Sequence, residues 1–311
     1  MVAQALGKII HENHGAVVNN VRTKRIIIED GKATGVELTD GTIHKSKTVI
    51  STVDPHQTFF KLVGEDNLST EFTEKLKGYQ WENHSLMVVH YAMEHAPKFK
   101  NPDIDNAYVY ILGLETQEAV IKEFDAVHHG DLPSEAHFNC CFPSVLDSRQ
   151  VLAPAAPGRC TGLFSRLAPY ELNDGGADRW YNLKFKEDLV KGFLKTLSSY
   201  APNITEDNIL WHYVTTPVDI ENKFPSMVKG GIKQGAYAPL QMGYQRPNDE
   251  CSTTQTPIEN LYLGGASTYP GGCVIWGPGY NVANKVAEDM GIAKWWKEPD
   301  CVTKAKEKGL L

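Results

Sequence analysis

Apolar residues recur at helical spacing in two parts of the chain. Val2, Leu6 and Ile9 follow one another at steps of four and three residues, which places them on one face of a helix. This pattern predicts an amphipathic helix over residues 2–12. A longer stripe of the same kind predicts a second helix over residues 183–200, with its apolar face turned toward a core.

Short apolar runs separated by turn residues lie between residues 25 and 51. Asp30-Gly31 supplies the positive φ angles of a tight turn, so residues 25–28 and 34–38 are predicted to form a β-hairpin. A further strand is expected over residues 43–51. Asp54-Pro55 then opens a helix, because proline is favoured in the first turn.

The far end of the chain combines a strand, a glycine-rich turn and a helix. Residues 258–263 are predicted to form the strand, and the helix is expected to start at Ala283. A helix N-terminus presents free N–H groups and a partial positive charge to an anion or a polarised ring edge. Glycine suits such a turn because a side chain would keep a planar ligand away from the backbone.

Two aromatic pairs have the spacing of residues on one face of a strand. Tyr79 with Trp81, and Tyr108 with Tyr110, are each two positions apart, which would place both rings of a pair on the same side of a sheet. The ordinary interpretation is core packing. A wall of a ligand pocket is the alternative.

Composition narrows the class of protein. The 311 residues are 41% hydrophobic and 22% charged, enough apolar material for a large core in one or two domains. The net charge of −7 argues against a nucleic-acid binder that relies on a broad basic face. No stretch reaches the roughly 18 apolar residues of a membrane span. We therefore expect a cytoplasmic globular protein.

Several strings resemble one family. The C-terminal string NLYLGGASTYPGG…GPGYNVA is similar to the flavin-binding motif of the phytoene-desaturase-like FAD-dependent oxidoreductases. The hairpin region and the S-x-x-D-P pattern of Ser51 to Pro55 occur in the same order in that family, and Arg246-Pro247 matches a further family motif. The resemblance spans about residues 2–290.

The resemblance implies a mixed α/β fold with two domains. Residues 1–55 and 241–292 would form part of an FAD-binding domain, and residues 56–240 would form a substrate domain with a mixed sheet. Residues 293–311 would be a C-terminal tail.

The resemblance also assigns residues to FAD. Thr23 would contact the adenine through its main chain, and the turn from Gly271 to Trp276 would lie beside the flavin ring. The whole set of expected cofactor-binding residues is Thr23, Gly264, Gly265, Ala266, Gly271, Gly272, Cys273, Gly279, Tyr280 and Asn281.

This sequence departs from the family pattern at the flavin face. Tyr269 stands where a histidine is common, and Cys273 to Trp276 replaces a run of smaller residues. Tyr269, Trp276 and Tyr280 are the candidates for the substrate-side wall. The sequence identifies no catalytic acid or base.

The family's G-x-G-x-x-G turn, which holds the ADP half of FAD, does not occur in this sequence. We favour a companion chain that supplies it, with a truncated protein as the alternative. The expected reaction transfers hydride from a C–H bond of a small, largely apolar substrate to the flavin. A non-catalytic scaffold or binding protein that kept the fold without flavin is the second hypothesis.

Histidines, acidic residues and cysteines gather between residues 128 and 141. Their spacing fits no standard zinc pattern, and Cys140 and Cys141 would point to opposite sides of a strand. We expect a loop followed by a core strand and no metal site.

Overall fold

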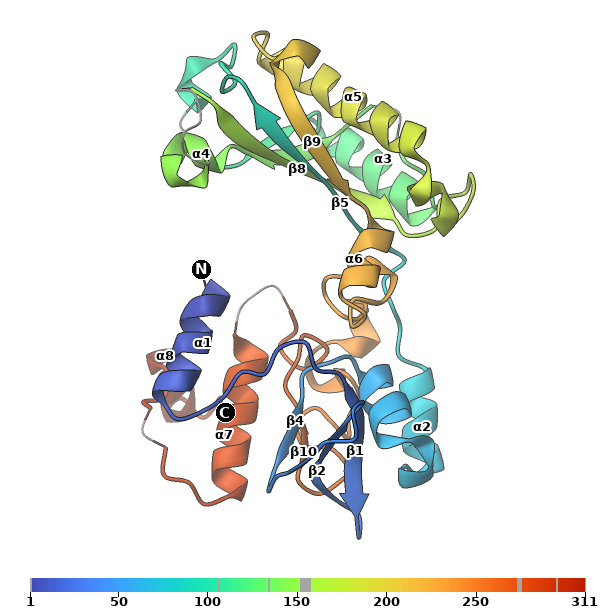
Figure 1. The fold of residues 1–311 in the computed structure, drawn as a ribbon, viewed down its shortest axis with the longest axis vertical. Coiled ribbons are helices and arrows are strands. Elements are labelled where there is room, and N and C mark those ends of the chain that lie inside the picture. The colour runs from blue at the N-terminus through green and yellow to red at the C-terminus, as the bar shows by residue number, and fades with distance from the viewer. Residues whose placement is uncertain are drawn as a thin grey trace. The chain divides into compact units, whose positions relative to one another are not determined.

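The computed structural model describes residues 2–105, 107–133, 135–151, 158–272, 276–294 and 296–310. The chain divides into two compact units (Figure 1). Unit 1 comprises residues 1–79 and 239–311, and unit 2 comprises residues 80–238. Both contain helices and strands, so the expected mixed α/β fold class is confirmed.

Unit 1 contains two small sheets with helices around them. Its main elements are α1 Val2–Glu12, β1 Thr23–Glu29, β2 Lys32–Leu38, β3 Ile43–Lys45, β4 Val49–Ser51, the π-helix η1 Gln57–Val63, α2 Thr70–Lys77, β10 Leu261–Leu263, α7 Gly277–Asp289 and α8 Asp300–Glu307. The predicted helix over residues 2–12 is therefore confirmed.

The hairpin of unit 1 forms as predicted, but the strand expected over residues 43–51 is broken in two. β1, β2 and β3 make an antiparallel sheet, with Asp30 and Gly31 at positive φ in the hairpin turn. A turn at Ser46, whose hydroxyl donates to the Thr48 carbonyl at 2.6 Å, separates β3 from β4. β4 then pairs in parallel with β10, more than 200 positions along the chain.

Residues 56–79, which we expected in the substrate domain, belong to unit 1. The rings of Phe59 and Phe72 pack edge to face with centroids 4.8 Å apart. Both lie in one buried cluster with Leu261 and Leu263 of β10. The helices that follow β4 therefore pack on the same core as β10, which places the boundary between the units at residue 80.

Unit 2 is built on a five-stranded sheet in which every pair of neighbouring strands is antiparallel, so the mixed sheet that we expected for this domain is wrong. Its main elements are β5 His84–Met93, β6 Tyr110–Leu112, α3 Gln117–His128, β7 Phe138–Cys141, α4 Pro143–Leu146, β8 Cys160–Pro169, α5 Leu183–Tyr200, β9 Ile209–Thr215 and α6 Pro217–Lys223, and the strand order is β6-β7-β8-β5-β9.

Helices α3 and α5 cover one face of this sheet (Figure 1). The predicted helix over residues 183–200 is α5. Its Phe193 ring packs 4.9 Å from Phe138 of β7, and Tyr91 of β5 donates a hydrogen bond to the α5 carbonyl of Val190 at 3.1 Å. These contacts fix α5 across the centre of the sheet.

The opposite face of the sheet carries partly exposed side chains. Pairing places Val88, His90 and Ala92 of β5 beside Leu163 of β8 and the residues of β9 on that face. The rings of Trp211 and Tyr213 stack there nearly parallel, with centroids 6.0 Å apart, and are 61% and 51% exposed. We call this surface the open sheet face.

The expected aromatic pairs do not form strand-face pairs. Tyr79 and Trp81 lie between α2 and β5, outside any strand. Tyr110 is buried in β6 and stacks on Phe99 at 4.4 Å, whereas Tyr108 precedes the strand and is exposed. Spacing alone misled here, because a period of two has meaning only within a strand.

Within the described ranges, no helix combines the length and the apolarity that a membrane crossing requires.

The packing of α5 on the sheet generates a stability prediction. Phe193→Ala removes a fully buried ring and should lower the free energy of unfolding of unit 2 by about 3–5 kcal/mol. Leu183→Ala, at a position 77% exposed in the same helix, should change it by less than about 0.5 kcal/mol. Hydrogen exchange of the β5 and β8 amides measures both, and equal effects would contradict the described core.

Candidate functional site

The glycine-rich turn after β10 lines an open pocket of about 280 Å³ in unit 1. The turn begins at the carboxyl end of β10, and α7 starts on its other side. Ligands of parallel sheets bind at such carboxyl ends. The lining residues are Gly264, Gly265, Ala266, Gly271, Gly272, Trp276, Pro278 and Gly279.

Two of these glycines are required by the protein's own packing. A Cβ atom on Gly265 would collide with the carbonyl oxygen of Thr52 and lie 2.9 Å from its carbonyl carbon. A Cβ atom on Gly264 would lie 3.0 Å from Val282 and 3.3 Å from Ile50. Internal packing therefore suffices to require glycine at these two positions, and a ligand's approach is not needed to explain them.

Gly279 differs from this pair. Among the described residues outside its own helix turn, no atom lies within 4 Å of a Cβ atom built there, although the residue lines the pocket. It lies in the first turn of α7, which begins at Gly277 rather than at the predicted Ala283. Trp276 precedes the helix at φ +60° and offers no side-chain hydrogen bond to its first turn. The N–H groups of Gly277 and Gly279 have no partner within the helix, and such groups fit an anion or a polarised ring edge.

A fully buried arginine holds the turn from behind. The Nε and Nη2 atoms of Arg246 donate to the carbonyl oxygen of Ala266 at 3.3 and 3.1 Å. Burial of a charge is costly without hydrogen bonds, so this contact fixes the peptide that forms one side of the pocket. In the sequence, Arg246 is recognisable only as part of a family motif. Its position beside a proline gave no sign of its partner.

The other end of α7 is tied to β10. The hydroxyl of Tyr262 donates to Asp289 at 2.7 Å, and burial together with this bond raises the pKa of Tyr262 to about 12. The hydrogen bond from Lys285 is the main cause that lowers the pKa of Asp289. The phenol therefore stays protonated and the carboxylate ionised at neutral pH, which keeps α7 aligned on the strand.

The predicted site residues fall into three groups. Six cofactor-binding candidates and the wall candidate Trp276 line the pocket; the six are Gly264, Gly265, Ala266, Gly271, Gly272 and Gly279. Four further candidates do not line the pocket: Thr23 at the start of β1, Tyr269, Tyr280 and Asn281. Asn281 donates a hydrogen bond to the Tyr269 carbonyl at 3.3 Å. Cys273 lies outside the described residues.

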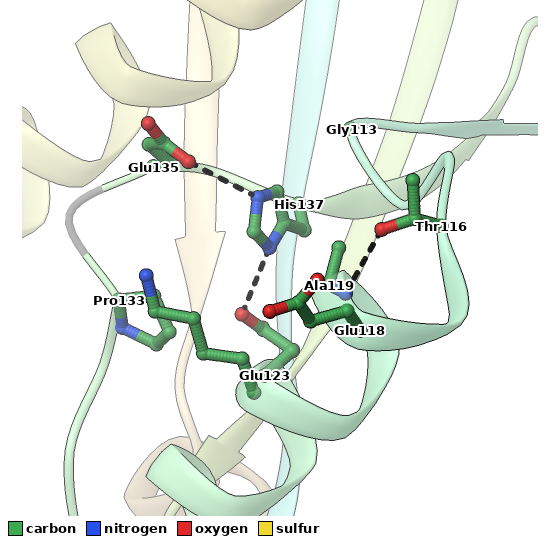
Figure 2. A pocket seen from close by; sticks show the side chains of 9 residues that line it. Gly113, Thr116, Glu118, Ala119, Glu123, Pro133, Glu135 and His137 are labelled. Atoms are coloured by element: carbon green, nitrogen blue, oxygen red, sulfur yellow. Dashed lines mark hydrogen bonds and ion pairs between the residues drawn. The ribbon is translucent and has the colours of Figure 1, made fainter.

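A larger cavity of about 440 Å³ lies in unit 2 beside α3 (Figure 2). Figure 2 shows His137 at its centre, between Glu123 and Glu135. The lining residues are Gly113, Thr116, Glu118, Ala119, Lys122, Glu123, Pro133, Glu135 and His137.

The polar side chains beside this cavity are engaged with one another. One carboxylate oxygen of Glu123 accepts from Arg166 at 2.7 Å, and the other lies 3.1 Å from His137 Nδ1. Both oxygens of this buried carboxylate are therefore used in joining α3 to β7 and β8. We interpret the cluster as structural, because removing one member of a buried pair leaves an uncompensated charge.

The cysteines of β7 alternate as expected, with Cys140 buried and Cys141 partly buried. Burial raises the pKa of both thiols, which disfavours the thiolate that metal binding or redox exchange needs. In the part of the chain that the structure describes, no group of three or more His, Cys, Asp or Glu residues could hold a metal ion.

The two kinds of glycine in the pocket generate a paired prediction. Gly265→Ala should lower the free energy of unfolding of unit 1 by about 1–3 kcal/mol, because its methyl group strikes backbone. Gly279→Ala should leave the stability unchanged or raise it by up to about 1 kcal/mol, since alanine favours the helix. Urea denaturation with exchange of the β10 amides measures both. A neutral Gly265→Ala would contradict the close approach to Thr52.

Curated proteins similar to this chain include a dehydrogenase subunit and a desaturase. A limonene dehydrogenase subunit of Castellaniella defragrans is 36% identical over 95% of this chain and 55% of the relative. Phytoene desaturase (neurosporene-forming) of Rhodobacter capsulatus is 27% identical over 92% of this chain and 52% of the relative. The chain thus spans about half the length of these curated relatives. No family model matches the sequence.

Solved structures agree in fold. An oxidoreductase from Methanosarcina mazei matches with a TM-score of 0.53 at 16% identity, over 91% of this chain and 52% of that one. The PF1083 protein from Pyrococcus furiosus matches with a TM-score of 0.50 at 16% identity, over 95% of this chain and 53% of that one. The motif strings and the relatives above show that this chain is similar to the phytoene-desaturase-like FAD oxidoreductase family.

Proposed function

We propose that this chain is a subunit of an FAD-dependent dehydrogenase or desaturase and that its glycine-rich pocket holds part of the flavin. The observation that carries the proposal is Gly279, which lines the pocket at the N-terminus of α7 beside space that no described residue fills. A pocket of about 280 Å³ encloses only part of a dinucleotide, so other groups must hold the remainder.

We assign the binding of the rest of the dinucleotide to a companion chain. The sequence has no G-x-G-x-x-G turn, the motif that holds the pyrophosphate in dinucleotide-binding folds. The similarity to one subunit of a limonene dehydrogenase supports a reaction of the same class and a chain that works with a partner.

The chain's own residues would bind the flavin and orient it. Gly271, Gly272 and Gly279 let a flat ring lie against backbone, and Arg246 keeps the Ala266 peptide in place. When bound, FAD supplies the redox chemistry by accepting hydride from a substrate C–H bond. Trp276, Tyr269 and Tyr280 are the proposed substrate-side wall, each between 37% and 56% exposed. The apolar surface of these three rings would exclude water from the reacting centre.

The open sheet face of unit 2 is the proposed binding surface for a small, largely apolar substrate. Leu163 and Val88 are partly exposed there, and the stacked Trp211 and Tyr213 rings add flat apolar area. Binding sites for such molecules are mostly apolar with few polar groups, and His90 supplies one on this face.

A scaffold protein without flavin is the second candidate. One observation favours it: the packing of Gly264 and Gly265 on β4 and α7 explains both glycines without any ligand. Gly279 has no such explanation, which is why we place the oxidoreductase first.

The deciding experiment measures flavin by absorbance and by released FAD in the complex purified from its native source through a tag on this chain. We expect FAD in the wild-type complex and at least a tenfold loss of occupancy in Gly279→Leu, whose side chain would fill the pocket. Ala283→Leu, on the exposed side of α7 outside the pocket lining, is the matched control and should retain FAD.

Absence of flavin from the wild-type complex would favour the scaffold. Equal flavin content in Gly279→Leu and wild type would remove the pocket from the flavin site, provided that circular dichroism shows both variants to be folded.

A further inference from the structure

Trp276 has a backbone conformation that is unusual for a large apolar residue. Its φ of +60° and ψ of −5° lie in the left-handed region, where the Cβ atom of an L-residue is crowded and glycine is favoured. A bulky residue at positive φ is an outlier, whereas short polar residues are tolerated there. Among the described residues, the other non-glycine residues at positive φ are all polar: His14, Asn20, Asp30, Lys229, Gln234, Thr254 and Asn260.

The packing of the described residues does not explain this tryptophan. A core tryptophan stabilises a fold by burying a large apolar area, but Trp276 is 56% exposed. The family motif also has smaller residues in the run from Cys273 to Trp276. Backbone strain of this kind occurs preferentially at ligand and active sites. The position therefore indicates that the indole acts on a ligand rather than on the core.

Trp276 and Gly279 are neighbours in the wall of the glycine-rich pocket. Both line this pocket of about 280 Å³, and the Tyr280 N–H donates to the Trp276 carbonyl at 3.0 Å in the first turn of α7. Residues three positions apart lie side by side at such a turn. Gly279 has no side chain, so a broad ring stands next to bare backbone. This combination fits a flat, apolar group.

The indole would select a ligand in two ways. Its ring takes up space that a smaller residue would leave to the ligand, and such a steric limit discriminates against larger molecules. Its π-face also favours unsaturated groups, because π-systems stack or pack edge to face on an aromatic ring.

We propose that Trp276 is a specificity-determining residue of the dehydrogenase. Its indole narrows the pocket, so that small apolar molecules with a flat, unsaturated group reach the flavin and molecules with a long chain on the same group do not. This inference rests on the proposed function, which supplies the flavin in the pocket.

The test measures binding to the complex purified from its native source through a tag on this chain. FAD content is determined first, and dissociation constants are then obtained from the change in the flavin absorption spectrum. The probes are 1-methylcyclohexene, its saturated counterpart methylcyclohexane, and 1-hexylcyclohexene, which carries a longer chain on the same ring. We expect wild type to bind 1-methylcyclohexene at least about tenfold more tightly than either of the others.

Three variants separate the contributions. Trp276→Gly should bring the dissociation constants of the two cyclohexenes within about threefold of each other, since the steric limit is gone. It is expected to fold, because glycine adopts this backbone conformation without crowding, and its urea midpoint should not fall. Trp276→Phe should keep the preference for the unsaturated ring. Tyr181→Ala removes a ring of unit 2 that is 58% exposed and should change none of the three constants.

Unchanged selectivity in Trp276→Gly, the same change in Tyr181→Ala, or no binding of 1-methylcyclohexene would overturn the inference, and FAD in these complexes would leave the proposed function standing. Loss of FAD from Trp276→Gly with retention in Trp276→Phe would make the ring a flavin contact and would also overturn its role in selection. A wild-type complex without FAD would overturn the proposed function, and the inference with it.

Discussion

The close approach of Gly265 to the carbonyl of Thr52 is the constraint on which the arrangement of unit 1 depends. It brings together two segments more than 200 residues apart and leaves no room for a side chain between them. The bond from Gly264 N–H to the Ser51 carbonyl continues the parallel ladder directly into this contact. The backbone of the turn after β10 is therefore held against the end of β4, and this contact determines where the pocket opens.

Polar groups buried on both sides of this contact keep it in place. The Ser51 hydroxyl pairs with Thr58 at 2.7 Å, and buried Asp54 accepts from the Gln57 N–H at 3.0 Å at the start of the following helix. Arg246 holds the Ala266 carbonyl from the other direction. Buried polar groups are stable only when their hydrogen bonds are made, so each of these residues specifies one conformation of the backbone it contacts. The pocket is thus shaped before any ligand enters, which lowers the entropic cost of binding.

Local patterns in the sequence predicted the elements that depend on local physics. The helices at residues 2–12 and 183–200 follow from apolar periodicity, and the hairpin follows from Asp30-Gly31 in its turn. The break at Ser46 lies in a wholly polar run from His44 to Thr48, which was the available signal for it, and the pairing of β4 with β10 requires the break. The partner of Arg246 was hidden, since it lies 20 positions away across a turn. Motif resemblance located the pocket but could not say which glycines serve packing and which serve a ligand.

That distinction decides how much the motif says about function. A glycine that its own neighbours require would be retained by any protein with this fold, whether or not it binds a cofactor, so Gly264 and Gly265 carry no information about chemistry. A glycine whose absent side chain would occupy open space inside a pocket is different, since the fold gains nothing from it and alanine would favour the helix. Gly279 is such a residue. Among the described residues nothing fills the space beside it, and the N-terminus of α7 favours a ligand with negative charge or polar ring atoms there. Gly279 in α7 therefore supports the proposed flavin site more than the number of glycines in the motif does.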